Sequence, residues 1–297
     1  MGAGRLMSFF FNLPVWIKPH LYSHKKFEEL SDNLIEELKN RLARFTTEEP
    51  DISVVIPAWN EEDTLFRTLS SLASNQIPNK VEIIVVNNNS TDKTQEILER
   101  LGVRNFSESQ QGIAFARQLG LTKARGQYHL CADSDTLYPP DWIELMVKPM
   151  RKDPNIVGVY GRYSFLPRNT EDLPILFFYE KITGLLIRLR RLKREFVNVL
   201  GFNMGFITEI GRNNGGFQVK DIRKFDNAPG SSFVDESEDG TMALNLMKTG
   251  KLKLVTDRKA RVFTSTRRLD ADGGILEAFI SRGKLHSTRL REYISGH

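Results

Sequence analysis

Two aspartates stand one residue apart, after an apolar run, in the stretch GQYHLCADSDTLYPP at residues 126–140. Asp133 and Asp135 could open a turn, because acidic residues often follow the end of a strand. They could instead hold a divalent cation against a phosphate group, since such cations take carboxylate oxygens as ligands. The elements around this pair indicate which of the two alternatives applies.

Three short apolar runs predict buried strands. They are ISVVIP (52–57), VEIIVVN (81–87) and QYHLCA (127–132). Segments with helical spacing lie between them, at 61–74, 90–102 and 112–126. We expect Ser90 or Thr91 to cap the second of these helices and Gly102 to end it. This alternation is typical of a parallel sheet that is covered by helices on both faces.

Each predicted strand is followed by polar residues, namely PAWNEE (57–62), NNNSTD (87–92) and DSDT (133–136). In parallel sheets of this kind, ligands bind outside the carboxyl ends of the strands. Three polar strand ends should therefore meet in one crevice. This arrangement favours the cation-binding alternative for Asp133 and Asp135 over the turn alternative.

An extension precedes this predicted sheet, and a looser second half follows it. Residues 1–50 should form an N-terminal helical extension, in which helical spacing joins Phe27, Leu30, Leu34, Leu38 and Leu42. Beyond residue 150 the pattern predicts strands at 156–165, 252–257 and 260–266 and helices at 175–196 and 275–294. It also predicts a strand or turn that leads into a short helix at 201–217. An acidic loop should enter a further helix at 235–251, which Gly250 should end.

The composition is that of a folded globular protein, with 297 residues, 40% hydrophobic and 27% charged. The single cysteine, Cys131, excludes an internal disulfide framework and a cysteine-based zinc site. No run approaches the ~18 apolar residues that span a bilayer. Asn12 and Pro14 interrupt the weakly signal-like N-terminus. We therefore expect a cytoplasmic protein.

Six segments of the chain match the motifs of a known family. They are VVIPAWNEE (54–62), VVNNNSTDKT (85–94), GIAFARQLGLTKARG (112–126), ADSDTLYPPDWI (132–143), GFNMGF (201–206) and EDGTMALNLMKTGK (238–251). In this order and at these spacings they resemble the family 2 glycosyltransferases, over about 52–268. The resemblance implies an inverting transfer of a sugar from a nucleotide-sugar donor to an acceptor.

The resemblance also implies the α/β fold called GT-A, in which helices flank a mostly parallel central sheet. The N-terminal extension and the amphipathic helix at 175–196 would be additions to it. Residues 51–297 would form one domain, with a nucleotide-binding half at 51–150 and an acceptor half with a C-terminal helix at 151–297.

The resemblance assigns the acidic pair to a site for Mg²⁺ or Mn²⁺. Asp135 matches the metal-binding carboxylate of the family, and Asp133 matches the aspartate near the ribose and the metal. Ser134 lies between them, in the donor site. The cation would neutralise the negative charge that builds up on the diphosphate leaving group.

The first strand end should bind the donor. Pro57, Ala58, Asn60 and Glu61 match the first nucleotide loop of the family, with Glu61 near the ribose. The same residues would also suit a helix N-terminus with Asn60 as its cap, and both roles can hold together.

The second strand end departs from the family, which usually has an aspartate there to read the base. Asn87 and Asn88 should contact the donor instead. An amide donates as well as accepts hydrogen bonds, so the sequence does not indicate that the donor base is uridine. Asp92 should support the helix that comes next. Arg117 matches a position near the donor, although a surface arginine on a helix would fit the pattern too.

The resemblance gives Asp239 the role of general base, which takes the proton of the acceptor hydroxyl during an inverting attack. Glu238 would support this aspartate or contact the acceptor, but both acids would also favour the N-terminus of the helix that follows. Arg267 and Arg268 could bind the diphosphate through their guanidinium groups or could end a surface strand. The Gln-x-x-Arg-Trp motif of processive members is absent, which implies a non-processive enzyme.

The helix predicted at 175–196 combines an apolar stripe with a basic end. The stripe consists of Phe178, Ile182, Leu185, Leu189, Leu192 and Phe196, and five basic residues crowd the span 188–194. Such a helix fits the interface of an anionic membrane. It would place the protein on the inner face of the cell membrane, with a glycan or lipid-linked acceptor of envelope polysaccharide or glycolipid synthesis. A helix packed on its own sheet, with solvated basic residues, is the alternative.

Three other functions are open from the sequence. A polyprenyl phosphate acceptor is already anionic and would not need Asp239 as a base. A nucleotide-binding or scaffold protein would have lost catalysis despite its intact acidic motifs. Nucleic-acid binding by the basic helix lacks a fitting module signature, so we expect no nucleic-acid partner.

Overall fold

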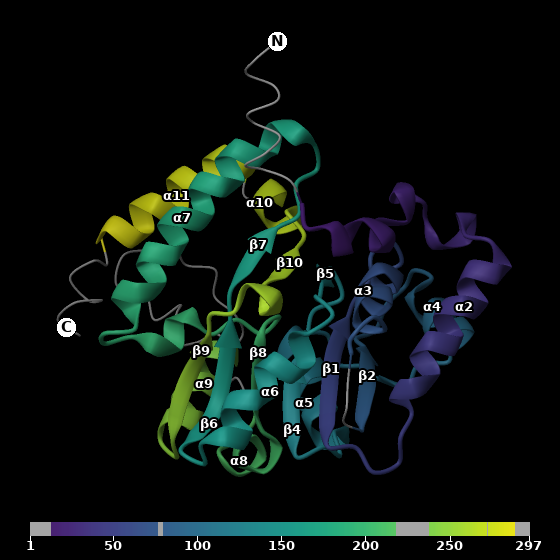
Figure 1. Ribbon diagram of the computed structural model, residues 1–297, viewed down its shortest axis with the longest axis horizontal. Coiled ribbons are helices and arrows are strands. Elements are labelled where there is room, and N and C mark those ends of the chain that lie inside the picture. Colours follow the sequence, from purple (N-terminus) through teal and green to yellow (C-terminus); the bar gives the residue numbers. More distant parts are fainter. Residues whose placement is uncertain (1–12, 77–79, 218–237, 272, 289–297) are drawn as a thin grey trace.

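The computed structural model describes residues 13–76, 80–217, 238–271 and 273–288. Within these residues a seven-stranded sheet has the order β3-β2-β1-β4-β8-β6-β9, and a three-stranded sheet has the order β5-β10-β7. Helices lie on both faces of the large sheet (Figure 1). This architecture confirms the predicted α/β class with a mostly parallel central sheet.

The bounds of the elements are as follows. The strands are β1 (Ile52–Ala58), β2 (Val81–Asn87), β3 (Asn105–Ser107), β4 (Tyr128–Cys131), β5 (Thr136–Leu137), β6 (Ile156–Gly161), β7 (Tyr163–Phe165), β8 (Met204–Ile207), β9 (Lys251–Val255) and β10 (Val262–Thr264). The α-helices are α2 (Asp32–Leu42), α3 (Leu65–Leu72), α4 (Thr94–Leu101), α5 (Ile113–Lys123), α6 (Trp142–Lys152), α7 (Leu173–Arg190), α8 (Thr208–Asn213), α9 (Glu238–Met247), α10 (Arg267–Ala271) and α11 (Ile275–Thr288). Short 3-10 segments are η1 (Val15–His24), η2 (Phe27–Glu29), η3 (Ala43–Phe45), η4 (Thr170–Asp172), η5 (Glu195–Asn198) and η7 (Arg258–Ala260).

The part of the large sheet from β3 to β4 is parallel. β1 pairs in parallel with β2 and with β4, so that Ile52 lies between Val81 and Tyr128. Every residue of β1 and β2 is buried, because helices cover both faces and parallel strands there carry continuous apolar runs. β4 and β6 both pair antiparallel with β8, so they run in the same direction. The residues that follow β1, β2, β4 and β6 therefore share one edge of the sheet.

Several predicted boundaries are wrong for local reasons. The strand predicted at 156–165 is two strands in different sheets, with Arg162 between them. Asn60 does not cap α3, because it adopts a left-handed φ of 54° four residues before Thr64, the residue that precedes the helix. Ser90 and Thr91 also lie before the start of α4, where an oxygen of Asp92 accepts the N–H of Thr94 at 2.9 Å.

Gly102 ends α4 as predicted, with a left-handed φ of 63° that favours glycine. The elements β3, β5 and α6 were outside the predicted set. The predicted acidic loop at 235–237 and the end of the C-terminal helix, at 289–294, lie outside the described residues.

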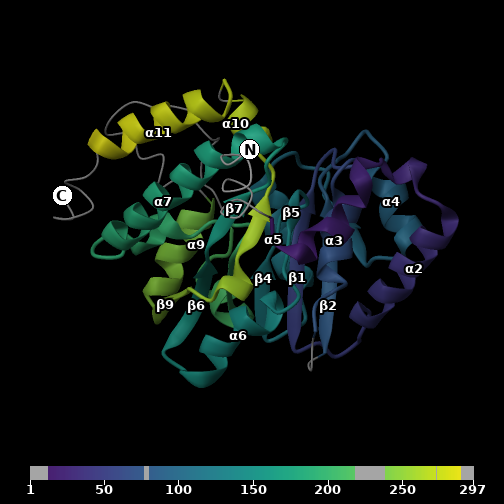
Figure 2. The same ribbon diagram turned by 45° about the horizontal axis from the view of Figure 1, so that its top comes forward.

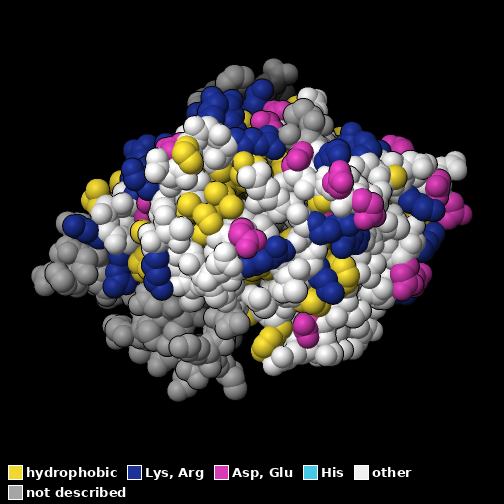
Figure 3. All heavy atoms as spheres, turned by 90° about the horizontal axis from the view of Figure 1, so that it is seen from below, with side chains coloured by type: hydrophobic (Ala, Val, Ile, Leu, Met, Phe, Trp, Pro, Cys, Tyr) yellow, Lys and Arg dark blue, Asp and Glu magenta, His cyan; other side chains and the backbone are white. Residues whose placement is uncertain are grey.

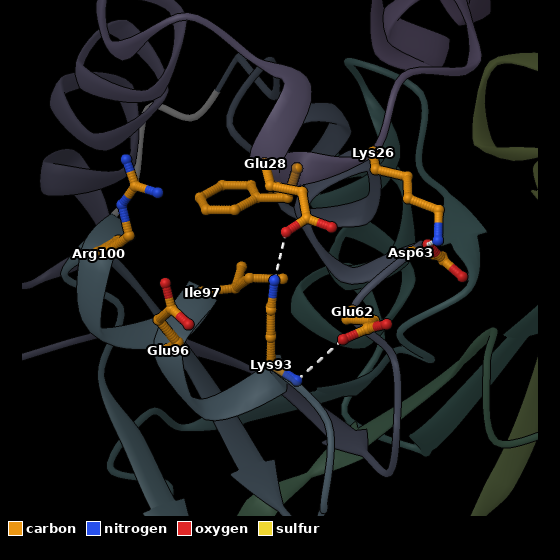
Figure 4. Close-up of a pocket in the computed structure, with 9 residues that line it drawn as sticks. Lys26, Glu28, Glu62, Asp63, Lys93, Glu96, Ile97 and Arg100 are labelled. Carbon is orange, nitrogen blue, oxygen red and sulfur yellow. Dashed lines mark hydrogen bonds and ion pairs between the residues drawn. The ribbon is translucent and has the colours of Figure 1, made fainter.

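The N-terminal extension packs on the main core. Its α-helix is shorter than predicted and buries Ile35, Leu38 and Leu42, while Leu34 of the predicted stripe is exposed. Phe27 precedes this helix and lies against Phe66, with ring centroids 5.7 Å apart. Charged side chains close the same contact around a shallow cavity of about 40 Å³ (Figure 4).

Two of these contacts involve Lys93, which directly precedes α4: one joins it to the N-terminal extension and the other to the loop before α3. Lys93 pairs with Glu28 through its ammonium group, and its backbone N–H donates to Glu62 at 3.0 Å. None of the residues predicted to bind the donor, metal or acceptor lines this cavity. We therefore read it as a structural joint between extension and domain.

The amphipathic helix α7 ends at Arg190 rather than at residue 196. It packs through Leu176, Tyr179 and Ile187, while the first three residues of the predicted apolar stripe face outward. Phe178 is 62% exposed, Ile182 45% and Leu185 57%. Leu192 and Phe196 lie beyond the helix, and Phe196 is buried. Phe178, Ile182 and Leu185 thus form an exposed apolar face on α7. None of the described helices is long and apolar enough to cross a bilayer.

α11 lies along α7 at one end of the molecule, and α2 lies at the other end (Figures 1 and 2). α11 adds two exposed apolar side chains, Leu276 and Ile280. On the face in Figure 3, Lys and Arg side chains lie among Asp and Glu side chains around small hydrophobic areas. Such mixing is ordinary for a solvated surface.

Candidate active site

Arg117 of α5 is the centre of a buried charge cluster. Its side chain is 3% exposed. Nη2 donates to Asp133 Oδ1 at 3.0 Å, and Nη1 donates to Glu238 Oε1 at 3.3 Å and to Asp239 Oδ1. The alternative of a surface arginine is therefore wrong. One cation joins the end of β4 to the start of α9, although these carboxylates lie 16, 121 and 122 residues away from it in sequence.

The backbone has to leave room for this guanidinium group. Gly201 lies against it, and a Cβ at that position would overlap the atoms of the Arg117 side chain. The N–H of Gly201 also donates to Asp239 Oδ2 at 2.7 Å. A glycine in GFNMGF therefore serves both close approach and hydrogen bonding.

Asp239 is ionised less readily than an ordinary aspartate. Burial raises its pKa to about 6, against the opposing effect of Arg117, and the neighbouring Glu238 raises it further. For Arg117, burial lowers the pKa, but the surrounding carboxylates, Asp239 first, outweigh burial and raise it above the ordinary value. The cluster thus holds a firmly charged arginine beside a carboxylate that is ionised only above about pH 6.

A second arginine, Arg267, pairs with the carboxylates of Glu61 and Asp135. Nη2 of Arg267, at the start of α10, lies 2.6 Å from Glu61 Oε1 and 3.1 Å from Asp135 Oδ2. Burial lowers the pKa of Arg267, but Glu61 and Asp135 outweigh burial and raise it. The side chain of Arg268 lies outside the described residues.

The small sheet positions Arg267 beside Asp135. The N–H of Ser265 donates to the carbonyl of Asp135 at 3.2 Å. The hydroxyl of Thr136 donates to that of Thr264 at 2.9 Å, across the antiparallel pair β5–β10. The basic strand end and the acidic pair therefore form one structural unit.

The chemistry of this corner fits a divalent cation. Glu61 and Asp135 already attract one positive group, and Asp133 lies two residues before Asp135. The described residues contain no group of three or more His, Cys, Asp or Glu side chains arranged to hold a metal. Mg²⁺ is ordinarily held by one or two carboxylates and completes its shell with substrate phosphates and water. Two aspartates without further protein ligands therefore match that mode.

The loops after β1 and β2 are tied to each other. The N–H of Asn60 donates to Ser90 Oγ at 3.0 Å, and its side-chain oxygen accepts the N–H of Thr91 at 2.8 Å. Ala58, next to the buried Pro57, accepts the N–H of Asn88 at 2.8 Å. The first two predicted donor segments thus form one surface.

The amides of the second segment are used within this surface. The side chain of Asn88 donates to the carbonyls of Glu108 and Gln110 and accepts the N–H of Gly112 at 2.8 Å. Asn87 donates to Gln95 at 2.8 Å. Both asparagines are buried, so their side chains hold the loops together. Ser134 is also buried, and its carbonyl accepts the hydroxyl of Thr68 at 2.8 Å.

Two residues of this region were not among the predicted site residues. Trp59 is 56% exposed directly after β1, and an aromatic residue within the polar run PAWNEE was a signal for it. The hydroxyl of Tyr138 accepts the N–H of Asp133 at 2.8 Å and donates to the carbonyl of Phe202 at 2.9 Å. It links the acidic loop to the loop that carries Gly201, a contact for which the sequence gives no signal.

Known structures of low sequence identity share this fold. Mannosyltransferase PcManGT from Pyrobaculum calidifontis, in complex with GDP-Man and Mn²⁺, has a TM-score of 0.53 at 17% identity, over 93% of this chain and 81% of that one. S. aureus TarS 1-349 in complex with UDP has a TM-score of 0.54 at 16% identity, over 83% of this chain and 71% of that one. These similarities confirm the predicted GT-A fold.

Sequence relatives indicate the family. An uncharacterized glycosyltransferase of Haemophilus influenzae is 30% identical over 144 residues, which are 46% of this chain and 57% of the relative. Poly-beta-1,6-N-acetyl-D-glucosamine synthase of Staphylococcus epidermidis is 34% identical over 174 residues, 54% of this chain and 41% of the relative. The chain thus spans less than two thirds of each of these two relatives. The model of glycosyl transferase family 2 matches residues 53–212, more than half of the sequence, and the chain belongs to that family.

Proposed function

We propose that the protein transfers a sugar from a nucleotide-sugar donor to an acceptor hydroxyl, with inversion and with a divalent cation. The observation that carries this proposal is the cluster in which Arg117 holds Asp133, Glu238 and Asp239 together. It brings an acidic group at a strand end, where donors bind in such sheets, next to a carboxylate with a raised pKa. The proposed donor site and the candidate base thereby share one positive partner, the buried guanidinium group of Arg117.

Asp133 and Asp135 would hold the cation, Mg²⁺ or Mn²⁺. When bound, the cation would neutralise the diphosphate leaving group. Arg267 lies at the same corner, 3.1 Å from Asp135, and its planar guanidinium suits phosphate oxygens. The exposed indole of Trp59 offers a flat surface on which a nucleobase can stack. Two solved structures of the same fold are complexes with GDP-Man and Mn²⁺ and with UDP, respectively, which supports a nucleotide and a divalent cation as ligands.

Asp239 would take the proton of the acceptor hydroxyl. A general base works best when its pKa lies close to the working pH, and a pKa of about 6 is nearer to neutrality than that of a free aspartate. The hydrogen bond from Gly201 fixes one carboxylate oxygen at 2.7 Å. Arg117 fixes the other oxygen, so the carboxylate orientation is set before the acceptor binds.

The donor half of the proposal is tested by ligand-induced thermal stabilisation. One nucleoside diphosphate or nucleotide-sugar, with Mn²⁺, should raise Tm by about 5–10 °C at roughly 100 times its Kd. Asp135→Asn should abolish the part of this shift that depends on Mn²⁺, because it removes a cation ligand. A panel of donors, scanned with Mn²⁺ and with EDTA, measures the effect and identifies the base.

Asp63→Asn is the matched control, since Asp63 forms an exposed ion pair with Lys26 at 3.6 Å and is not among the predicted donor or metal residues. It should keep the full shift. If no donor stabilises the wild type, the donor site assignment is wrong. If a donor binds but no acceptor is glycosylated, a nucleotide-binding protein without catalysis is the better description.

We also propose that the protein works at the cytoplasmic face of a membrane, on a glycan or lipid-linked acceptor. Phe178, Ile182 and Leu185 give α7 an outward apolar face, and the exposed Arg188 follows on the same helix. An apolar helix face with nearby cations suits the interface of an anionic membrane. Leu276 and Ile280 of the adjoining α11 are exposed as well.

Leu185→Glu should weaken binding to vesicles of phosphatidylglycerol and phosphatidylcholine by at least about tenfold, because it removes an apolar contact and adds a repelled charge. Vesicle sedimentation measures this change. Leu34→Glu on α2 is the control, since Leu34 is similarly exposed at the opposite end of the molecule. Equal vesicle binding by the two variants would contradict a membrane role for α7.

A further inference from the structure

Arg162 stands between β6 and β7, outside every role assigned above. It directly follows β6, which runs parallel to β4 two strands away. Neighbouring strands lie ~4.8 Å apart, so its backbone is about 10 Å from that of the acidic pair along the same edge of the sheet. Arg162 also belongs to the half of the chain that is predicted to bind the acceptor.

Two further arginines lie next to Arg162. β7 and β10 pair in parallel with Tyr163 opposite Val262, which puts Arg261 beside Arg162. The N–H of Val262 donates to the carbonyl of Arg162 at 3.2 Å. Arg188 approaches from α7, and burial together with the charges of Arg261 and Arg188 lowers the pKa of Arg162. Arg162 and Arg261 are thus neighbours in the small sheet, and the charge of Arg188 reaches them from α7.

Within the described residues this cluster has one carboxylate partner, Glu180, for three guanidinium groups. Arg261 pairs with Glu180 through Nη1 at 3.2 Å. The Nε atoms of Arg162 and Arg261 are both buried without a partner among the described residues. Buried donors are normally satisfied, and exceptions point to an ion or water. An anion would satisfy these spare donors and offset the repulsion between the guanidinium groups.

We propose that Arg162, Arg188 and Arg261 bind a phosphate group carried by the acceptor. The proposal rests on the proposed function, whose acceptor it specifies. Guanidinium groups bind phosphate through two parallel N–H···O bonds, with the strength of charge-assisted hydrogen bonds. Because Arg188 belongs to the helix with the exposed apolar face, the phosphate can be that of a lipid headgroup. It can equally be that of a soluble phosphorylated acceptor.

Inorganic phosphate is the first probe. In EDTA and at constant ionic strength, phosphate but not chloride should raise the Tm of the wild type. Arg162→Gln should weaken the apparent phosphate affinity by at least about tenfold, and without phosphate it should be as stable as the wild type or more so, because repulsion is relieved. Arg258→Gln, with the same change of charge on the exposed η7, should keep the response.

Arg267→Gln separates this site from the donor site. It should keep the phosphate response while weakening metal-dependent donor binding, whereas Arg162→Gln should do the reverse. If Arg162→Gln keeps the phosphate response, or if the wild type shows none, the inference is wrong. If the phosphate response behaves as expected but no donor binds, the proposed function fails and the anion site stands.

The source of the phosphate is decided by two further probes. Vesicles containing phosphatidic acid should compete with inorganic phosphate for the wild type, but not for Arg162→Gln, if the phosphate is a lipid headgroup. Glycerol 3-phosphate should compete while these vesicles do not if the acceptor is soluble. Competition by neither probe would mean that the cluster holds an adventitious ion only, which overturns the proposal.

Discussion

Asp239→Asn should lower kcat by about 10²–10⁴-fold, the usual effect of removing a general base, without destabilising the fold at neutral pH. The sign of the stability effect follows from the pKa. Because burial raises the pKa of Asp239 to about 6, its ionisation costs folding free energy at higher pH. This free-energy cost reaches its full size above about pH 6 and vanishes below the ordinary pKa of aspartate, 3.8. Asparagine removes the cost and keeps one oxygen to accept the N–H of Gly201, while Arg117 retains Asp133 and Glu238 as acceptors.

Single-turnover kinetics and thermal unfolding measure the two effects, with Glu238→Gln as the neighbouring control. The wild-type kcat/KM should fall below about pH 6, where Asp239 becomes protonated, and the residual activity of Asp239→Asn should lack this dependence. Undiminished turnover in Asp239→Asn would exclude the base. It would then favour an acceptor that is already anionic, such as a polyprenyl phosphate, whose phosphate oxygen needs no deprotonation.

The strands that are buried on both faces can be predicted from the sequence. β1 and β2 are continuous apolar runs because both of their faces are covered, so their positions are visible without a structure. β5 has two residues and β3 has three, too few for any periodic pattern. α6 follows two prolines and contains Pro149, and these residues mask its helical spacing.

The site is predictable only in part, since its contacts join distant segments. Polar strand ends indicate where Asp133 and Asp135 meet other loops. They do not reveal that Arg117 contacts Asp239, 122 residues away, or that Arg267 spans Glu61 and Asp135. The outward face of α7 shows the same limit. Its spacing predicts an apolar stripe, but only the tertiary packing through Leu176 and Tyr179 decides which side is buried.

Arg117→Met should cost about 3–5 kcal/mol of folding free energy, the usual effect of removing one partner from a buried ion pair. Methionine fills a similar volume but leaves the carboxylates of Asp133, Glu238 and Asp239 without their shared cation. The pKa of Asp239 should rise further, so the loss of stability should be larger at pH 8 than at pH 5. Urea unfolding at both pH values measures this difference.

A double-variant cycle identifies the cause of that loss. If the loss of the shared guanidinium charge destabilises Arg117→Met, adding Asp239→Asn should recover part of the stability, because one of the carboxylates that Arg117 neutralised is gone. Arg100→Met, at an exposed pair with Asp32, should cost less than about 1 kcal/mol. Strictly additive effects of Arg117→Met and Asp239→Asn would mean that lost packing dominates. Arg117 would then stabilise the protein mainly by packing between α5 and β4. It would not act mainly as the counterion that allows three acidic groups to share one buried site.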